Sequence, residues 1–225
     1  MLVFMKSKHW PLWLLLGLLL LILLLTMTVT MSLENRPAMQ RFAVAGTSPA
    51  ASLEWQQTVT KVQRLMEAND LTAAENLLLQ MLSQHPDKKD GWMQLGIVSY
   101  RMGKFPQSEQ AFRHILRQQP NNAAAYNNLS LTLQQLQRTA EAEQAIRHAI
   151  QLEPKNGEIQ LNAASFYAQQ DQDIIALNHL QKAINNGITP ERISTYRELV
   201  QLLEQPEYLN YYQQLQHRNS QPQSN

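Results

Sequence analysis

The sequence predicts an all-α protein: an α-α superhelix of about four helix-turn-helix repeats with a C-terminal capping helix, preceded by a single transmembrane helix. Two observations lead to this fold class. The pattern of large, small and proline residues recurs with a period of about 34 residues from position 55 to position 190. A separate leucine-rich stretch, residues 10–31, contains no charged residue.

The amino-acid composition excludes several classes of function. The chain has no cysteine, which excludes disulfides, thiolate metal sites and thiol catalysis. Its net charge of +1 implies no field strong enough to recruit nucleic acid. Local clusters such as Lys88–Lys89 lack interleaved aromatic residues and are interpreted as solvated faces, so no nucleic-acid partner is expected.

Residues 10–31 are predicted to form a transmembrane signal anchor. As a helix they would span about 33 Å, enough for a hydrocarbon core of about 30 Å. A cleaved signal peptide is the alternative. Its apolar region is usually shorter and ends near a cleavage site of small residues, whereas the nearest such triplet, Ala43-Val44-Ala45, lies well beyond the apolar stretch.

Charges beside the span predict its orientation. Lys6, Lys8 and the terminal amine precede it, and Arg36 and Arg41 come after it together with a glutamate. The slight excess at the start favours a cytoplasmic N-terminus, residues 1–9. The remainder would then face away from the cytoplasm, which in a Gram-negative bacterium means an inner-membrane protein with its repeats in the periplasm.

Residues 32–54 are predicted to be a flexible linker. They include Pro37, Gly46 and Pro49 among small residues and show no sustained hydrophobic period.

The repeat region covers residues 55–188, and each unit should contain two antiparallel helices. Prolines recur at Pro86, Pro120 and Pro154, where they end one unit and turn the chain into the next. The predicted repeats are 55–88, 89–122, 123–156 and 157–190. Small residues recur where the helices must approach closely, at Ala74, Ser108, Ala142 and Ala176, and large ones at Leu78, Phe112, Ile146 and Leu180.

The order of these positions resembles the tetratricopeptide repeat. The second unit has Trp92-x-x-Leu95-Gly96 and then Ser108-x-x-x-Phe112 before Pro120, and the third shows the same order. The first unit departs from the pattern at Lys61 and the fourth at Gln160. The alternative is an unrelated helical bundle whose spacings coincide by chance.

Residues 189–216 are predicted to cap the array, because a terminal repeat needs a polar-faced cover. The segment Glu191–Glu204 should be one helix, and Tyr208 after it would either pack on the last repeat or remain exposed. Residues 217–225 are polar and predicted to be disordered. The apolar stripe of the capping helix consists of Ile193, Tyr196, Leu199, Val200 and Leu203.

No catalytic, cofactor or metal site is predicted. His114 and His148 occupy equivalent positions of adjacent repeats and could in principle hold a metal, but no acidic or cysteine partner lies at ligand spacing. They are interpreted as surface histidines. The sequence contains no Ser/His/Asp order, glycine-rich phosphate loop or HExxH motif, so an enzyme is not expected.

The resemblance implies a right-handed superhelix whose first helices line a concave groove that binds a peptide. Ile97 and Leu131 would serve either as ligand contacts or as packing between helices. Because the groove positions carry few charges, they suit an extended or helical segment with apolar anchors and a hydrogen-bonded backbone. The first repeat contributes Val59, Gln63 and Met66; the remaining groove residues are Met93, Ile97, Tyr100, Arg101, Asn127, Asn128, Leu131, Gln134, Gln135, Leu161, Ser165 and Gln169.

The predicted function is a membrane-anchored scaffold that captures a segment of a protein partner during assembly of an envelope complex. An anchor followed by such repeats is similar to assembly factors for c-type cytochromes, and equally to proteins of secretion, pilus or cell-division machinery. The alternative is a structural subunit of a membrane complex that uses its convex face and its transmembrane helix.

Overall fold

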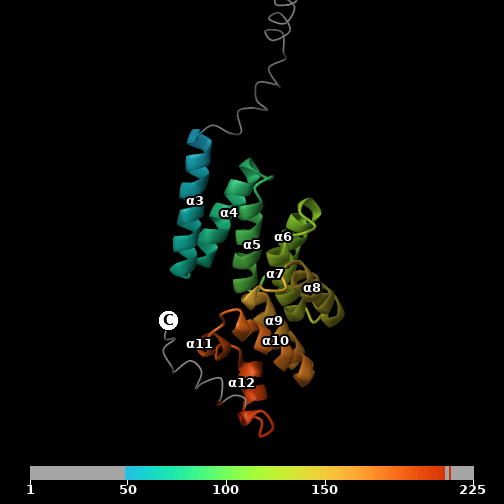
Figure 1. Ribbon diagram of the computed structural model, residues 1–225. Helices are drawn as coiled ribbons and strands as arrows, with labels where there is room; N and C mark the ends of the chain where they lie inside the picture. Colours follow the sequence, from blue (N-terminus) through green and yellow to red (C-terminus); the bar gives the residue numbers. More distant parts are fainter. Residues whose placement is uncertain (1–48, 211–212, 214–225) are drawn as a thin grey trace, which may run out of the picture. The chain divides into compact units, whose positions relative to one another are not determined.

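The computed structural model describes residues 49–210 and residue 213, and every regular element within them is an α-helix (Figure 1). The chain divides into two compact units between residues 57 and 58, and the repeat array belongs to the second. The helices are α3 (Pro49–Glu67), α4 (Leu71–Gln84), α5 (Lys89–Arg101), α6 (Phe105–Gln118), α7 (Ala123–Gln135), α8 (Thr139–Leu152), α9 (Gly157–Ala168), α10 (Asp173–Asn185), α11 (Pro190–Ile193) and α12 (Arg197–Leu203).

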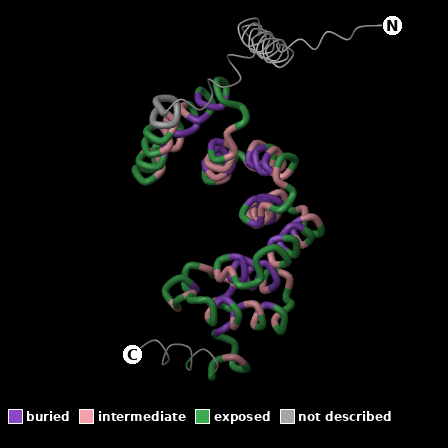
Figure 2. Tube along the Cα trace, turned by 45° about the horizontal axis from the view of Figure 1, so that its top comes forward, coloured by how far each residue is buried: buried purple, intermediate pink, exposed green. Residues whose placement is uncertain are grey.

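These helices form a repeat stack, which confirms the predicted all-α class. From α4 to α10 each helix packs against the next, and α5, α7, α9 and α12 also pack on one another in turn. Because α5 contacts α7 and α7 contacts α9, the first helices of successive repeats lie side by side, as in a superhelical array. Buried residues gather where neighbouring helices face each other (Figure 2).

The membrane anchor predicted at residues 10–31 lies outside the described residues. Among residues 49–210, no helix is both long and apolar enough to cross a bilayer. The predicted linker is wrong at its C-terminal end, because α3 already begins at Pro49. Proline suits the first position of a helix, where its missing N–H would have no partner in any case.

The turns between paired helices share one backbone feature that repeats with the sequence. Asn69, Gly103, Gln137 and Asp171 occupy equivalent positions of successive repeats, and all four have positive φ, between 55° and 73°. This left-handed conformation reverses the chain after each first helix, and only glycine adopts it without steric cost. The backbone conformation therefore repeats every 34 residues at this position, although the residue type does not.

Asparagine and aspartate side chains begin several helices. Asp70 accepts a hydrogen bond from the Ala73 amide at 3.1 Å, and Asn122 accepts one from the Ala125 amide at 2.8 Å. Asn156 does the same for α9. Such caps satisfy amide groups that have no partner within the helix.

The small-residue positions allow the two helices of a repeat to approach closely. A Cβ atom on Gly96 would lie 2.6 Å from the Phe112 ring, far inside van der Waals contact. At the equivalent position Ser130 is buried, and its hydroxyl donates to the Ala142 carbonyl at 2.8 Å. Glycine at position 96 is thus required by the phenylalanine that faces it.

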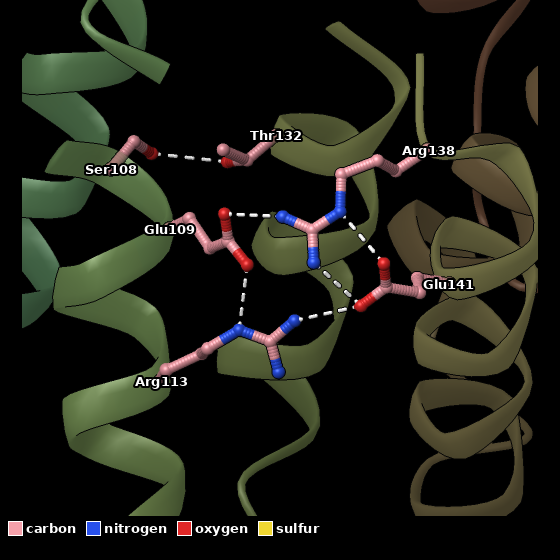
Figure 3. Close-up of polar contacts among 6 residues, drawn as sticks. All are labelled: Ser108, Glu109, Arg113, Thr132, Arg138 and Glu141. Carbon is pink, nitrogen blue, oxygen red and sulfur yellow. Dashed lines mark hydrogen bonds and ion pairs between the residues drawn. The ribbon is translucent and has the colours of Figure 1, made fainter. Parts of the chain in front are cut away.

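An ion-pair ladder links the second helices of the first three repeats, and Figure 3 shows its step between Glu109 and Arg138. Lys104 pairs with Glu75 at 2.6 Å, and Arg138 pairs with Glu109 at 2.7 Å, in each case between one repeat and the next. Glu143 is the next glutamate in this series, but Gln172 stands where the next cation would be. The ladder therefore ends at the fourth repeat.

Figure 3 also shows how this ladder is extended between α6 and α8. Arg113 and Arg138 both donate to Glu109 and Glu141, so the four side chains form a closed network. Hydrogen bonds from Arg138 lower the pKa of the Glu141 carboxyl. Because Arg113, Arg138 and Glu141 are 39–45% exposed, solvent screens the network, and its contribution to stability will fall with added salt.

The capping segment differs from prediction. The sequence predicts one helix over Glu191–Glu204, whereas the structure has α11 and α12 separated by a break after Ile193. The Ser194 hydroxyl donates to the Glu191 carbonyl at 2.8 Å, and the Thr195 hydroxyl to the Arg192 carbonyl at 2.7 Å. Short polar side chains that bond nearby backbone in this way compete with helix continuation.

One buried hydroxyl gives a stability prediction. Ser99 in α5 is fully buried, and its Oγ makes no hydrogen bond within the described residues. A buried hydroxyl without a partner costs about 1 kcal/mol or more. We expect Ser99→Ala to raise the free energy of unfolding by about 1 kcal/mol in urea denaturation. Ser130→Ala is the matched control and should lower it, because Ser130 has a partner.

Candidate functional site

Val59, Gln63 and Met66 lie on α3, and the other predicted groove residues lie on α5, α7 and α9 or, for Gln169, directly after α9. We call the surface formed by α5, α7 and α9 the first-helix face. The side chains of its groove residues are not equally accessible, and their burial divides them into three groups. Half-buried are Met93, Ile97, Tyr100, Asn127, Asn128, Leu131 and Gln134; exposed are Arg101, Gln135 and Gln169; buried are Leu161 and Ser165.

Tyr100 connects the second and third repeats on this face. Its ring meets Phe105 edge-on with centroids 5.6 Å apart, and its side chain hydrogen-bonds with Gln135 of α7. Burial raises the pKa of the Tyr100 phenol, and the bond to Gln135 opposes that shift. The tyrosine is therefore held in place with part of its surface still accessible, a geometry suited to an aromatic contact.

Arg101 has a structural role that the sequence did not indicate. Its guanidinium donates to the Met66 carbonyl and to the Asn69 side chain, both at 3.1 Å. Met66 lies in the last turn of α3, where carbonyl groups lack helical partners. Arg101 thus links the second repeat to the end of the first helix of the preceding repeat.

The two asparagines of α7 differ in whether their side-chain oxygen already accepts a hydrogen bond. The Asn128 amide donates to the Ala124 carbonyl at 3.0 Å and makes a longer contact to the Met93 sulfur. Its carbonyl oxygen accepts no hydrogen bond within residues 58–210. Asn127, in contrast, accepts from Asn162 of α9 at 2.9 Å. Of these two residues, Asn128 is therefore the one whose side-chain oxygen can accept a hydrogen bond from a ligand.

Two of the predicted groove residues of the fourth repeat are buried and cannot contact a ligand. Leu161 is 0% exposed and packs in a cluster with Leu199 and Leu203, and Ser165 is 3% exposed and donates a hydrogen bond to Glu198. Both predictions are wrong because α12 packs on α9. The first-helix face is therefore open on α5 and α7 and covered on α9.

Polar contacts hold the capping segment against α9. Arg192 donates to both carboxylate oxygens of Glu158, at 3.1 and 2.9 Å. The Tyr196 hydroxyl donates to Asn162 at 2.8 Å. Tyr208 also packs against the main core, as one of the two predicted alternatives expected.

The two histidines of the repeat register stack on aromatic rings. His114 lies over Trp92 with ring centroids 4.1 Å apart, and His148 lies over Tyr126 at 5.0 Å. In each repeat the stack joins the first helix to the second. Within the described residues, no group of three or more His, Asp or Glu side chains could hold a metal ion.

The fourth repeat replaces this arrangement with hydrogen bonds. Gln160 stands in place of the aromatic residue, and its amide donates to the Pro154 carbonyl at 2.8 Å. The Trp92 indole donates to Pro86 at the same distance. Gln160 therefore preserves the contact to the repeat-ending proline, and its other end bonds His179 at 2.7 Å.

His179 gives a pH prediction. Burial and then the charge of Lys182 lower its pKa from 6.5 to about 4. The unfolded chain binds the proton more readily, so stability falls as pH drops from 6.5 toward 4. The ring is only half-buried, and after discounting for solvent screening we expect a loss of about 1 kcal/mol.

Thermal unfolding of the parent and of His179→Gln across this window would test it. The variant cannot titrate, so its unfolding temperature should fall less than that of the parent. The charge that acts on His179 is Lys182 of its own helix; the Tyr167 ring, whose hydroxyl accepts from Arg147 of α8, stacks on the imidazole. Equal pH dependence in both proteins would contradict the prediction.

Comparisons with known proteins agree with this geometry. Family models described as tetratricopeptide repeat match residues 65–131 and 123–156. No protein of established function aligns significantly with the sequence.

Solved structures show the same fold. TTC0263, a thermophilic tetratricopeptide protein of Thermus thermophilus, superposes with a TM-score of 0.61 at 19% identity, covering 69% of this chain and 84% of that one. MamA from Desulfovibrio magneticus RS-1 superposes with a TM-score of 0.53 at 16% identity, covering 58% and 74%. Residues 65–156 of this chain are therefore tetratricopeptide repeats.

Proposed function

We propose that this protein is a binding scaffold whose first-helix face captures a segment of a partner protein through apolar anchor residues. One observation carries the proposal. Helix α7, Ala123–Gln135, contains no charged residue, yet it holds Asn127, Asn128 and Leu131 partly exposed on the open part of that face. A helix that only had to remain soluble would carry charges there.

The chemistry of this face defines the segment it suits. Of the predicted groove residues only Arg101 is charged, and it is engaged with α3. Met93, Ile97 and Leu131 supply apolar contacts, and the free carbonyl of Asn128 accepts a backbone N–H. Such a surface suits a segment with apolar anchors and exposed peptide groups. Its affinity should depend only weakly on ionic strength, since few counterions are displaced.

Photocrosslinking in whole cells tests the proposal. A photoreactive amino acid at Tyr100 should attach a specific protein, whereas one at Arg113 on α6 should not. Adding Asn128→Ala to the protein labelled at Tyr100 should reduce the adduct about tenfold while helicity is unchanged. Equal adducts from both positions would place the contact elsewhere.

The membrane anchor is also part of the proposal. The uncharged stretch at residues 10–31 supports a signal anchor with the N-terminus in the cytoplasm and the repeats in the periplasm. The scaffold would then act in assembly or maturation of an envelope complex, such as cytochrome c biogenesis, secretion or pilus assembly. A periplasm-active reporter fused after Gln216 should be active; activity from a cytoplasmic reporter alone would contradict this topology.

A second candidate is a structural subunit that uses the convex face formed by the second helices. Ile174 at the start of α10 favours it, since its side chain is 82% exposed. Such an apolar side chain on a second helix suits a protein contact. In this case the crosslinker at Arg113 would give the adduct, and the one at Tyr100 would not. Catalysis is not part of either proposal.

A further inference from the structure

Glu198 lies where the open part of the first-helix face meets its covered end. It is in the first turn of α12, and its carboxylate accepts hydrogen bonds from Ser165 and, at 3.0 Å, from the Gln169 amide. Ser165 lies in the last turn of α9 and Gln169 directly follows the helix; both occupy predicted groove positions. The carboxylate is therefore fixed against the groove side of α9.

The charge of Glu198 is not neutralised within residues 58–210. Both of its hydrogen-bond donors are neutral, and it forms no ion pair there. Neither nearby cation of the capping segment pairs with it: Arg197, the preceding residue, forms no ion pair within residues 58–210, and Arg192 is engaged by both carboxylate oxygens of Glu158 and by the Tyr196 hydroxyl. Glu75, Glu109 and Glu141 differ, because each of them meets a cation.

The surroundings connect Glu198 to the open face. Tyr196 lies beside it, and the pKa of the Tyr196 phenol is raised by burial, lowered by Arg192, and raised further by the charges of Glu158 and Glu198 and by Tyr100. The Tyr196 hydroxyl donates to Asn162, whose amide in turn donates to the groove residue Asn127 at 2.9 Å, so hydrogen bonds connect the capping segment to α7. A segment lying across α5 and α7 would reach Glu198 as it leaves the open part.

A carboxylate in the first turn also stabilises the N-terminus of its own helix. That role alone would not require two donors from another helix. Their contacts fix the orientation of the carboxylate and reduce the entropy lost on pairing with a cation. The otherwise uncharged face would then have one charged contact, placed at its end.

We propose that the partner segment carries a lysine or arginine side chain that pairs with Glu198, next to the apolar residues held by α5 and α7. This rests on the proposed function and specifies the partner further. Charge complementarity is the reason for a basic side chain: an unpaired carboxylate at the rim of a neutral surface selects a cation and disfavours an acidic residue.

Selection from a random peptide display library, on the full chain in detergent micelles, tests the inference. The parent protein should enrich peptides with apolar residues and one Lys or Arg at a constant spacing, at least about fivefold over the input. Glu198→Gln should keep the apolar enrichment and lose the basic one. Glu198→Lys should favour Asp or Glu at that position.

The control is Glu204→Gln, which removes an exposed carboxylate after the end of the same helix and should select like the parent. Circular dichroism of each variant establishes that the fold is retained. Two results would overturn the inference but not the binding function. One is that Glu198→Gln enriches basic residues as the parent does; the other is that the parent selects apolar peptides without basic residues. Absence of any enriched sequence from the parent would refute the proposed function itself.

Discussion

Phe112→Ala is expected to lower the free energy of unfolding of the repeat domain by about 3–5 kcal/mol. Phe112 is 1% exposed and lies in the main core cluster, whose members come from α6 to α10 and α12. Removing the ring would leave a cavity between the two helices of the second repeat. Because each repeat is stabilised by its neighbours, the loss should affect the cooperative unfolding of the whole array.

Urea denaturation followed by circular dichroism measures this effect. Leu152→Ala is the matched control, since this leucine is 37% exposed and should cost less than about 1 kcal/mol. A loss of similar size in both variants would contradict the central role of Phe112.

Gly96→Ala should also be destabilising, because the new methyl group would overlap the Phe112 ring. Phe112→Leu alone should destabilise as well, but it makes room for that methyl group. The double variant should therefore be more stable than the sum of the two single effects predicts. Additive effects would show that the two positions are not in contact.

Much of the fold could be predicted because its determinants recur in the residue types themselves. Proline, small and large residues repeat together in the second and third units, so the pairing of helices could be inferred from spacing. The positive φ angles at the turns could not be predicted, since Asn69, Gly103, Gln137 and Asp171 share no residue type. The ion-pair ladder was missed, although the regular recurrence of its glutamates, one in each of the first three repeats, was visible in the sequence.

The candidate site was harder to predict because exposure depends on the segment after the last repeat. The register correctly aligned Leu161 and Ser165 with groove positions of earlier repeats, yet α12 covers them. A signal was present: Arg192 bonds Glu158 and Tyr196 bonds Asn162, in each case 34 positions back along the chain. The capping segment therefore continues the register as the first helix of a fifth, incomplete repeat.

Leu199→Ala is expected to destabilise the fourth repeat by about 2–5 kcal/mol. Leu199 is 0% exposed and packs in the cluster that also contains Leu161, Leu180 and Leu203. This cluster joins α12 to α9 and α10, so truncating the leucine should loosen the cover over α9. Val200→Ala is the matched control, because this neighbour is only half-buried and should cost less.

Hydrogen exchange resolved along the chain would separate a local effect from a global one. In an array whose repeats contact only their neighbours, Leu199→Ala should increase exchange in α9 and α10 first, with α5 and α6 protected longer. This result would establish α12 as a permanent end cover rather than a displaceable gate, since the apolar surface beneath it cannot be left in water at low cost. If α9 and α10 instead remained fully protected, the fourth repeat would be stable without its cover. Displacement of α12 by a partner would then be energetically accessible, and Leu161 and Ser165 would regain the ligand-facing role that their register suggests.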